Sequence, residues 1–296
     1  MHEKFVGPGI VLLSGVAAFL IGVFLGPAAL AQSTVKANGS TTVAPVVSAA
    51  AEVLKSKGLR VTVDTQGGSS GGLTSVSEGF ADVGLMSRPL TEQDKRTHPN
   101  EDLRENVIGY DGLAIVVSQP VYEGGVTTLT KAQIRSLYEG KVKNWKDVGG
   151  PDARIVFFNK EPGRGTWEVF AQFVYGKAEL APKVFHPEVG ANQEALTKVS
   201  QHKSAVTQLS ASWAAVAKNI RVVGIRKEDG KVSLPTREEI EKETYPLRRP
   251  LVLVTRGAPR GDVAKLVSFF DTTEGRSIVE KAGFLSKVGA LAKAGR

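Results

Sequence analysis

Hydroxyl side chains and glycines cluster at three points in the first third of this 296-residue chain. GSTT occupies residues 39–42, GGSSGG residues 67–72 and MSRP residues 86–89. Serine and threonine hydroxyls, together with backbone N–H groups that no side chain shields, can donate several hydrogen bonds to one anion. A single such residue is more often only a helix N-cap, and a Gly/Ser run can be a flexible linker. Three clusters in succession favour an anion-binding site.

A fourth cluster adds positive charge. The apolar run RIVFF is followed by NKEPGRGT, which places Lys160, Arg164 and Thr166 around the expected start of a helix with an aromatic face. Basic residues in a surface loop are usually only solvated. Their position at a helix start favours anion binding, because the first turn of a helix has free N–H groups and partial positive charge.

The segments around these clusters alternate between strand-like and helix-like patterns. Alternation of this kind is typical of an α/β fold with a mainly parallel sheet, in which ligands bind beyond the carboxyl ends of the strands. The Gly/Ser run lies between a strand and a helix, which favours a binding loop over a linker. The expected strands are TVKAN, LRVTVDT and ADVGLM, followed by helical or polar segments at 42–57, 71–78 and near TEQDKR.

Length and composition limit the class of protein. A chain of 296 residues with 42% hydrophobic residues suits two globular lobes. The 38 Lys and Arg against 30 Asp and Glu give a net charge of +8, scattered along the chain, which only weakly suggests nucleic acid. Cysteine is absent, which excludes disulfides, thiol catalysis and Cys-ligated metal.

The N-terminus predicts export. Lys4 precedes an apolar stretch over residues 5–25, and Ala29 and Ala31 have the spacing that signal peptidase accepts. We expect a signal peptide over residues 1–31 and a soluble periplasmic protein that begins at Gln32. The alternative is a retained anchor, because about 20 apolar residues can span a bilayer.

Several longer motifs resemble those of a known family, the phosphate-binding receptors of bacterial ABC transporters, within the periplasmic binding proteins. The resemblance covers nearly the whole mature chain. It rests on GSTTVAP, GGSSGG, ADVGLMSRPL, DGLAIVV, LTKAQIRSLYEGKVKNWKDVGG, EPGRGT and YPLRRPLVLVT, in the family's order and spacing.

This resemblance implies a type II periplasmic-binding-protein fold of class α/β. Each of two lobes would have a central mixed sheet flanked by helices, and a two-stranded hinge would let them close on one dehydrated oxyanion. We expect residues 32–118 and 246–296 to form lobe I and residues 119–245 to form lobe II. A monomeric receptor, without cofactor or metal, would deliver inorganic phosphate to the permease subunits of an ABC transporter.

The resemblance also implies the ligands of the phosphate. Position by position it gives Thr41 and the backbone of Thr42, then Ser69, then Ser87 with Arg88 from the first lobe, and Gly165 with Thr166 from the second; Ser40 and Ser70 are adjacent and are expected to share the role. The chain departs from the family where Lys160 replaces an arginine and Arg164 replaces a serine. Since a guanidinium can grip two oxygens at once, we interpret Arg164 as the main cation of the second lobe and Lys160 as secondary.

Selectivity is the least determined property. Phosphate near neutral pH keeps a proton that a carboxylate can accept, and sulfate does not. Many relatives have an aspartate where this chain has Ser87, so the acceptor has to come from elsewhere. The candidates are Asp64, Asp111 and Glu161, with Asp82 as a weaker fourth. We predict phosphate over sulfate, with another tetrahedral oxyanion as the alternative ligand.

Other classes of function fit less well. The four histidines have no catalytic setting, and GGSSGG lacks the Gly-x-Ser-x-Gly pattern of esterases. A Gly-Lys-Ser/Thr phosphate loop is absent. Most aromatic residues fall on apolar faces, which argues against nucleic-acid binding. We therefore predict a binding protein that is not an enzyme, with a secreted adhesion or scaffold module as the remaining alternative.

Overall fold

The computed structural model describes residues 1, 2, 4 and 34–287. The predicted signal peptide at residues 1–31 lies, apart from those three residues, outside the described part of the chain. The compact body is described from Thr34 onward. Within it, no described helix has both the length and the apolar character needed to cross a membrane.

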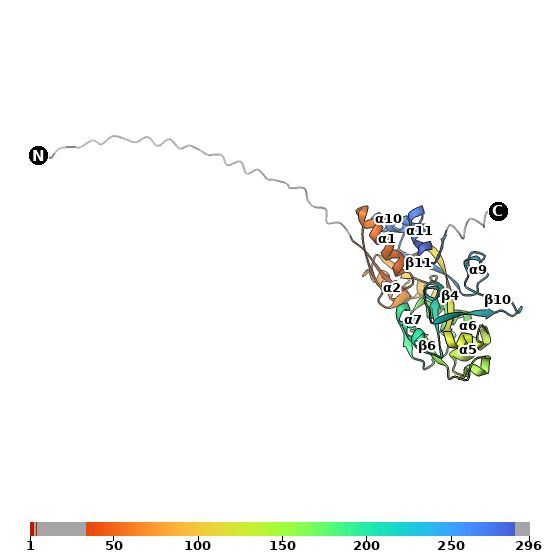
Figure 1. The fold of residues 1–296 in the computed structure, drawn as a ribbon. Helices are drawn as coiled ribbons and strands as arrows, with labels where there is room; N and C mark the ends of the chain where they lie inside the picture. Colours follow the sequence, from red (N-terminus) through yellow and green to blue (C-terminus); the bar gives the residue numbers. More distant parts are fainter. Residues whose placement is uncertain (3, 5–33, 288–296) are drawn as a thin grey trace. The chain divides into compact units, whose positions relative to one another are not determined.

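The first lobe is built from both ends of the body around a mixed sheet, in the strand order β2-β1-β3-β11-β4 (Figure 1). Strands β1, β2 and β3 are parallel, whereas β11 is antiparallel to both of its neighbours. The strands are β1 (Thr34–Gly39), β2 (Arg60–Asp64), β3 (Val83–Met86), the first part of β4 (Leu103–Ser118), β11 (Arg248–Arg256) and β12 (Leu285–Ser286). The helices are α1 (Ala44–Ser56), α2 (Gly68–Ser77), α3 (Glu92–Thr97), α10 (Gly261–Phe269) and α11 (Thr273–Lys281).

The second lobe is a continuous stretch of chain. Its sheet extends from the end of β4 through β8, β6 and β7, and β9 also pairs with β4. The strands are β5 (Thr128–Thr130), β6 (Val156–Lys160), β7 (Glu188–Val189), β8 (Ala205–Ser210), β9 (Ile220–Arg226) and β10 (Val232–Ser233). The helices are α4 (Gln119–Glu123), α5 (Lys131–Tyr138), α6 (Gly165–Tyr175), α7 (Asn192–Gln201), α8 (Ala211–Ala215) and α9 (Arg237–Glu241), with short 3-10 turns η1 (Trp145–Val148) and η2 (Ala178–Leu180).

Each lobe has its own apolar cores, one on each face of its sheet. In β11, Leu251 and Leu253 join one core while Val252 and Val254 join the other, as the two-residue period of a strand requires. In the second lobe, the end of β4 alternates in the same way between two further cores. Strands buried on both faces need apolar residues at nearly every position, which explains runs such as VGLM and LAIVV.

Two connections link the lobes. Strand β4 pairs with β11 up to Gly112 and with β8 from Leu113 onward, so one strand belongs to both sheets. The second connection runs beside it, because the Leu113 N–H donates to the Leu247 carbonyl at 2.9 Å. The predicted two-lobed fold with a two-stranded hinge is therefore confirmed. The change of sheet falls at residues 112 and 113, whereas the sequence placed this crossing near residue 118.

The Gly/Ser run is a helix start rather than a loop before a helix. We expected the helix to begin near Gly71, but α2 begins at Gly68, and Gly67 at its N-cap has a positive φ of 69°. The later glycines let the helix approach its neighbours. A Cβ on Gly72 would lie 2.6 Å from the Asn38 carbonyl oxygen, and one on Gly71 would lie 2.3 Å from that of Gln66. The glycines thus bring the start of α2 close against β1.

Candidate functional site

One cavity gathers most of the predicted residues, at the place where the two lobes meet. It is small, about 10 Å³, close to the space that one water molecule needs. Its lining comes from both lobes. Ser40, Thr41, Thr42, Gly68, Ser69 and Ser87 belong to the first, and Lys160, Arg164, Gly165, Thr166, Gly190 and Asn192 to the second.

Helix starts from both lobes face each other across this cavity. A Cβ on Gly68, the first residue of α2, would lie 2.6 Å from Cδ of Arg164. A Cβ on Gly165, the first residue of α6, would lie 2.5 Å from Oγ of Ser69 and 2.7 Å from Oγ of Ser87. Glycine is thus required for the approach of the lobes. The first N–H groups of these helices have no partner within their helix, and they add partial positive charge to the site.

The cavity hydroxyls share one property, which is that each accepts a hydrogen bond from a protein N–H group. Among the described residues, none of these six hydroxyls donates to a protein acceptor, so their hydrogens are available to a ligand. The distances are 3.2 Å from Thr42 N to Ser40 Oγ, 3.1 Å from Ser87 N to Ser69 Oγ, 3.4 Å from Asn192 N to Thr41 Oγ1, 2.9 Å from Asn192 Nδ2 to Thr42 Oγ1, 2.9 Å from Arg249 Nη1 to Thr166 Oγ1 and 3.4 Å from Arg249 Nη1 to Ser87 Oγ.

Lys160 is fully buried at the end of β6. Its Nζ donates to the carbonyl of Gly190 at 2.9 Å and to that of Ala191 at 3.0 Å. Burial, together with the positive charges of Arg164 and Arg249, lowers the pKa of Lys160 to about 7. A proton-free anion in the cavity would offset all three effects, because it would supply the missing opposite charge.

A buried arginine that the sequence analysis did not select supports the site from behind. The Arg249 guanidinium donates to Oδ2 of Asp111 from Nε at 2.9 Å and from Nη2 at 2.7 Å, and its Nη1 reaches Thr166. Asp111 also accepts from the Ser210 hydroxyl at 3.0 Å. Burial raises the pKa of Asp111, and the adjacent guanidinium opposes that shift. The Arg249–Asp111 pair therefore connects β11 and β4 with the hydroxyls of Thr166 and Ser210 in the second lobe.

Ser70 and Arg88 lie outside the cavity lining and link the lobes instead. The Ser70 N–H donates to the Gly163 carbonyl at 3.0 Å, and its hydroxyl donates to Oε1 of Glu168 at 3.0 Å. Nε of Arg88 pairs with Oε2 of Glu168, and Nη1 pairs with Asp94 at 2.6 Å. We expected Arg88 to bind the anion, but its guanidinium is held by two carboxylates.

None of the cavity-lining residues is a carboxylate. Glu161 contacts a lining residue, because its Oε2 accepts from Nε and Nη2 of Arg164 at 2.9 and 2.7 Å. Asp111 is held by Arg249, and Asp64 is exposed. The carboxylate acceptors considered from the sequence therefore do not line the cavity.

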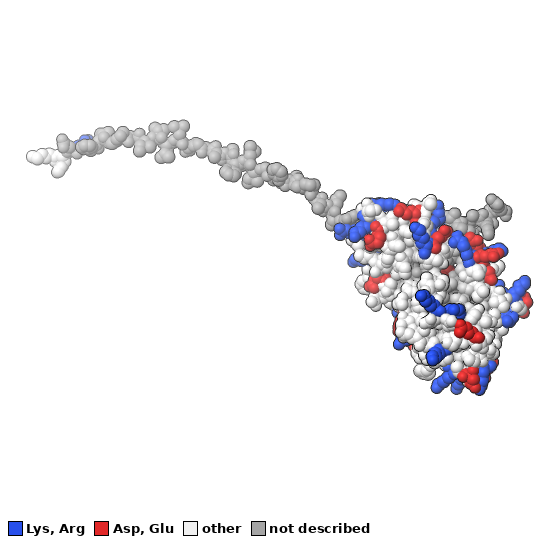
Figure 2. All heavy atoms as spheres, viewed as in Figure 1, with Lys and Arg blue, Asp and Glu red and all other residues white. Residues whose placement is uncertain are grey.

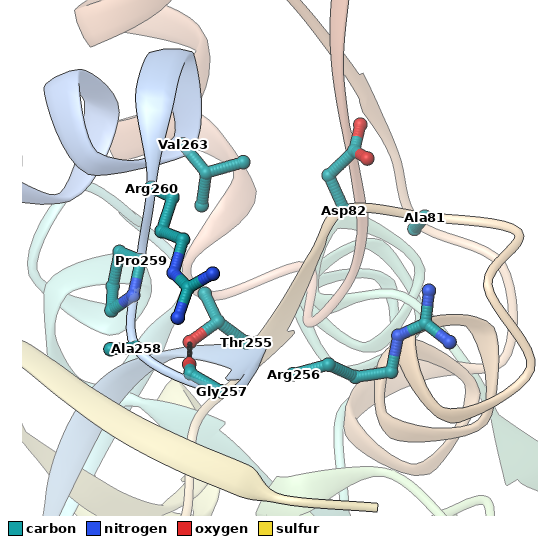
Figure 3. A pocket seen from close by; sticks show the side chains of 9 residues that line it. All are labelled: Ala81, Asp82, Thr255, Arg256, Gly257, Ala258, Pro259, Arg260 and Val263. Atoms are coloured by element: carbon teal, nitrogen blue, oxygen red, sulfur yellow. Dashed lines mark hydrogen bonds between the residues drawn. The ribbon is translucent and has the colours of Figure 1, made fainter.

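Asp82 borders a different hollow, at the far end of the first-lobe sheet (Figure 3). This hollow of about 430 Å³ is lined by Asp82 and Arg256 on one side and by Arg260, just before α10, on the other. Oδ2 of Asp82 accepts from the Lys36 N–H at 2.8 Å. Because β1 and β3 run away from this edge, it is the opposite end of the sheet from the cavity.

Asn192 and Arg249 are the polar residues of this region that sequence reasoning missed. Asn192 opens α7 and is a common residue type at a helix start, so its sequence carries little signal. Arg249 could have been found from the motif YPLRRPLVLVT, because a charged residue within an apolar strand needs a buried partner.

The comparisons with known proteins agree with this geometry. The PBP superfamily domain matches residues 26–272. The chain therefore belongs to the PBP superfamily.

Individual relatives within that superfamily are named for phosphate binding or phosphate transport. The chain is 28% identical over 267 residues to the phosphate-binding protein PstS of Borreliella burgdorferi, covering 86% of this chain and 90% of the relative. A structure from Clostridium perfringens, described as a phosphate ABC transporter substrate-binding protein with bound phosphate, has 30% identity and a TM-score of 0.75, covering 86% of this chain and 99% of that one. An ABC-type phosphate transport receptor from Vibrio cholerae has 27% identity and a TM-score of 0.67, covering 85% and 99%. These likenesses agree with the family that the sequence motifs indicated.

Proposed function

We propose that this protein is an extracytoplasmic receptor that binds inorganic phosphate between its lobes and delivers it to the permease of an ABC transporter. The observation that carries the proposal is the set of six hydroxyls that accept internal N–H bonds and keep their own hydrogens for a ligand. Donors of this kind, with two helix starts and two cations, suit a dehydrated oxyanion. The relatives named for phosphate binding supply the identity of the anion.

The direct ligands in this proposal are the lining residues. They comprise the predicted Ser40, Thr41, Thr42, Ser69, Ser87, Lys160, Arg164, Gly165 and Thr166, together with Asn192. Ser70 and Arg88 take part through contacts between the lobes. The charges outside the cavity are mixed in sign on the face that Figure 2 shows, and neither sign forms a continuous patch there. Such a surface fits a receptor for a small anion better than one for nucleic acid.

Export is the second part of the proposal. We infer that residues 1–31 are a signal peptide cleaved after Ala31, which would release a periplasmic protein that begins at Gln32. N-terminal sequencing of the exported protein tests the cleavage, and a retained leader would favour an anchored receptor.

Equilibrium dialysis with radiolabelled phosphate tests the binding function. Arg164→Ser should weaken binding about tenfold or more, since a charge-assisted hydrogen bond contributes about 1.5–3 kcal/mol. Arg256→Ser is the control for loss of one arginine charge, because Arg256 is exposed and borders the hollow of Figure 3. Absence of phosphate binding by the unmodified protein would leave the scaffold alternative. An equal loss of phosphate affinity in the two variants would mean that Arg164 does not bind the phosphate directly.

A second anion has support from one observation. Sulfate carries no proton at neutral pH, so it needs only donors, and the cavity lining contains no carboxylate to repel it. Competition between sulfate and phosphate decides between a phosphate receptor and a broader oxyanion receptor.

A further inference from the structure

The cavity offers many donors and few acceptors. Its hydroxyls already accept N–H bonds, and the helix starts and cations can only donate. Hydrogenphosphate must place its own proton on an acceptor, whereas sulfate has none to place. The residue that receives this proton determines how the site distinguishes the two anions.

Lys160 has the geometry of that acceptor. Its Nζ uses two tetrahedral positions for the carbonyls of Gly190 and Ala191, and one position remains on a residue that lines the cavity. In an ammonium group that position is a third N–H, and in a neutral amine it is a lone pair. The third position can therefore donate a hydrogen bond in the ammonium form and accept one in the neutral form.

The surroundings of Lys160 keep both forms accessible. Arg164 at the start of α6 and Arg249 on β11 disfavour its positive charge, while Glu161 after β6 and Glu194 on α7 favour it. Asp111 reduces the influence of Arg249 by pairing with it. Burial and these charges bring the pKa of Lys160 to about 7.

We infer that Lys160 is the specificity-determining residue of the site: its neutral amine accepts the proton of hydrogenphosphate, whereas only its ammonium form can hold a proton-free oxyanion such as sulfate. This inference rests on the proposed phosphate-binding function. In the phosphate complex, the O–H of hydrogenphosphate donates to the Nζ lone pair, and no proton is gained or lost when both partners are already in these forms. Sulfate binding to the neutral form must be accompanied by uptake of one proton from the solvent.

The two anions then respond oppositely to pH. The ammonium fraction falls about tenfold per unit above a pKa of about 7, so sulfate affinity should fall about tenfold between pH 6 and pH 8. Phosphate affinity should rise over the same interval, because the neutral amine and the dianion both become more abundant. Selectivity for phosphate should therefore increase by more than tenfold.

Isothermal titration in buffers of different ionisation heat measures the proton count on the unmodified protein. We expect uptake of close to one proton with sulfate at pH 8 and close to none with phosphate. Equal proton counts, or a phosphate-to-sulfate ratio that does not change with pH, would overturn the inference. Phosphate binding without sulfate binding at pH 6 would also overturn it. Absence of binding by either anion would instead refute the proposed function.

Two variants separate charge from proton acceptance. Lys160→Arg keeps a permanent charge, so its sulfate affinity should not depend on pH and its preference for phosphate should be lost. Lys160→Met has neither charge nor acceptor, and it should bind both anions weakly. Circular dichroism and thermal unfolding check that each variant folds, and the proton count on the unmodified protein remains decisive if either does not. Retained, pH-dependent selectivity in a folded Lys160→Arg variant would assign the proton to a hydroxyl.

Discussion

Gly165 gives the sharpest test of how the lobes close. The residue opens α6 in the second lobe, and the nearest atoms to an added Cβ are the hydroxyls of Ser69 and Ser87 in the first lobe, at 2.5 and 2.7 Å. Both distances are shorter than any normal contact. In an open form the lobes separate and the same methyl group meets nothing from the first lobe. Gly165→Ala should therefore act on the closed, liganded form alone.

The expected loss of phosphate affinity follows from the close contact that the added methyl group makes in the closed form. Overpacking of a close contact costs about 1–3 kcal/mol, which corresponds to about a 5- to 150-fold loss of phosphate affinity. Displacement of either hydroxyl would add the loss of a hydrogen bond to the anion. The stability of the unliganded protein should stay unchanged or rise, since alanine is better than glycine in a helix by about 0.5–1 kcal/mol.

Titration calorimetry and thermal unfolding of the same variant supply the two measurements, with small-angle scattering as a check on compaction by phosphate. Weaker binding without loss of stability is the expected result. Unchanged affinity would mean that the lobes do not close as tightly at Gly165 as the structure has them. A loss of unliganded stability would mean that the closed form persists without phosphate, which would refute the reasoning that closure depends on the ligand.

Three further predictions concern separate parts of the site. Ser69→Ala should lower phosphate affinity about tenfold or more, because a hydrogen bond to a charged group contributes about 1.5–3 kcal/mol; calorimetry with no change would exclude this hydroxyl. Glu168→Gln removes the charge that holds Arg88 across the lobes, so phosphate should compact the variant less in scattering experiments, and full compaction would show that this contact is dispensable. Arg249→Leu leaves the Asp111 carboxylate buried without its partner and should reduce the free energy of unfolding by about 3–5 kcal/mol in urea titrations. The double variant with Asp111→Asn should recover a large part of this loss. A double variant no more stable than Arg249→Leu alone would mean that the buried charge is not the cause.

The sequence predicted the positions of the hydroxyl clusters well, because their place between strand and helix puts them at one edge of the sheet. The alternation of patterns and the family motifs were sufficient for the fold and the two lobes. The start of α2 was wrong by about one turn, because glycine has a poor intrinsic helix propensity and the close approach to β1 outweighs it.

The partners of charged residues were much harder to predict. Arg249 and Asp111 lie 138 residues apart, and only the pairing of β11 with β4 brings them together. Arg88 looked like an anion ligand because its motif follows β3, yet Glu168, far along the chain, neutralises it. A local pattern shows that a charge is present, but it does not show which distant carboxylate satisfies it.

The placement of β11 has a consequence for the order in which the two lobes fold. Strand β11 lies between β3 and β4, yet it follows the whole second lobe in the sequence. The second-lobe cores draw on residues 113–247, so this lobe can complete its interior before β11 arrives. The first lobe cannot complete its interior at that stage, because the position between β3 and β4 stays empty until β11, which comes late in the sequence, is available. We therefore expect the lobe that contains the first strands of the body to finish folding last, with the edges of β3 and β4 exposed to other chains until then.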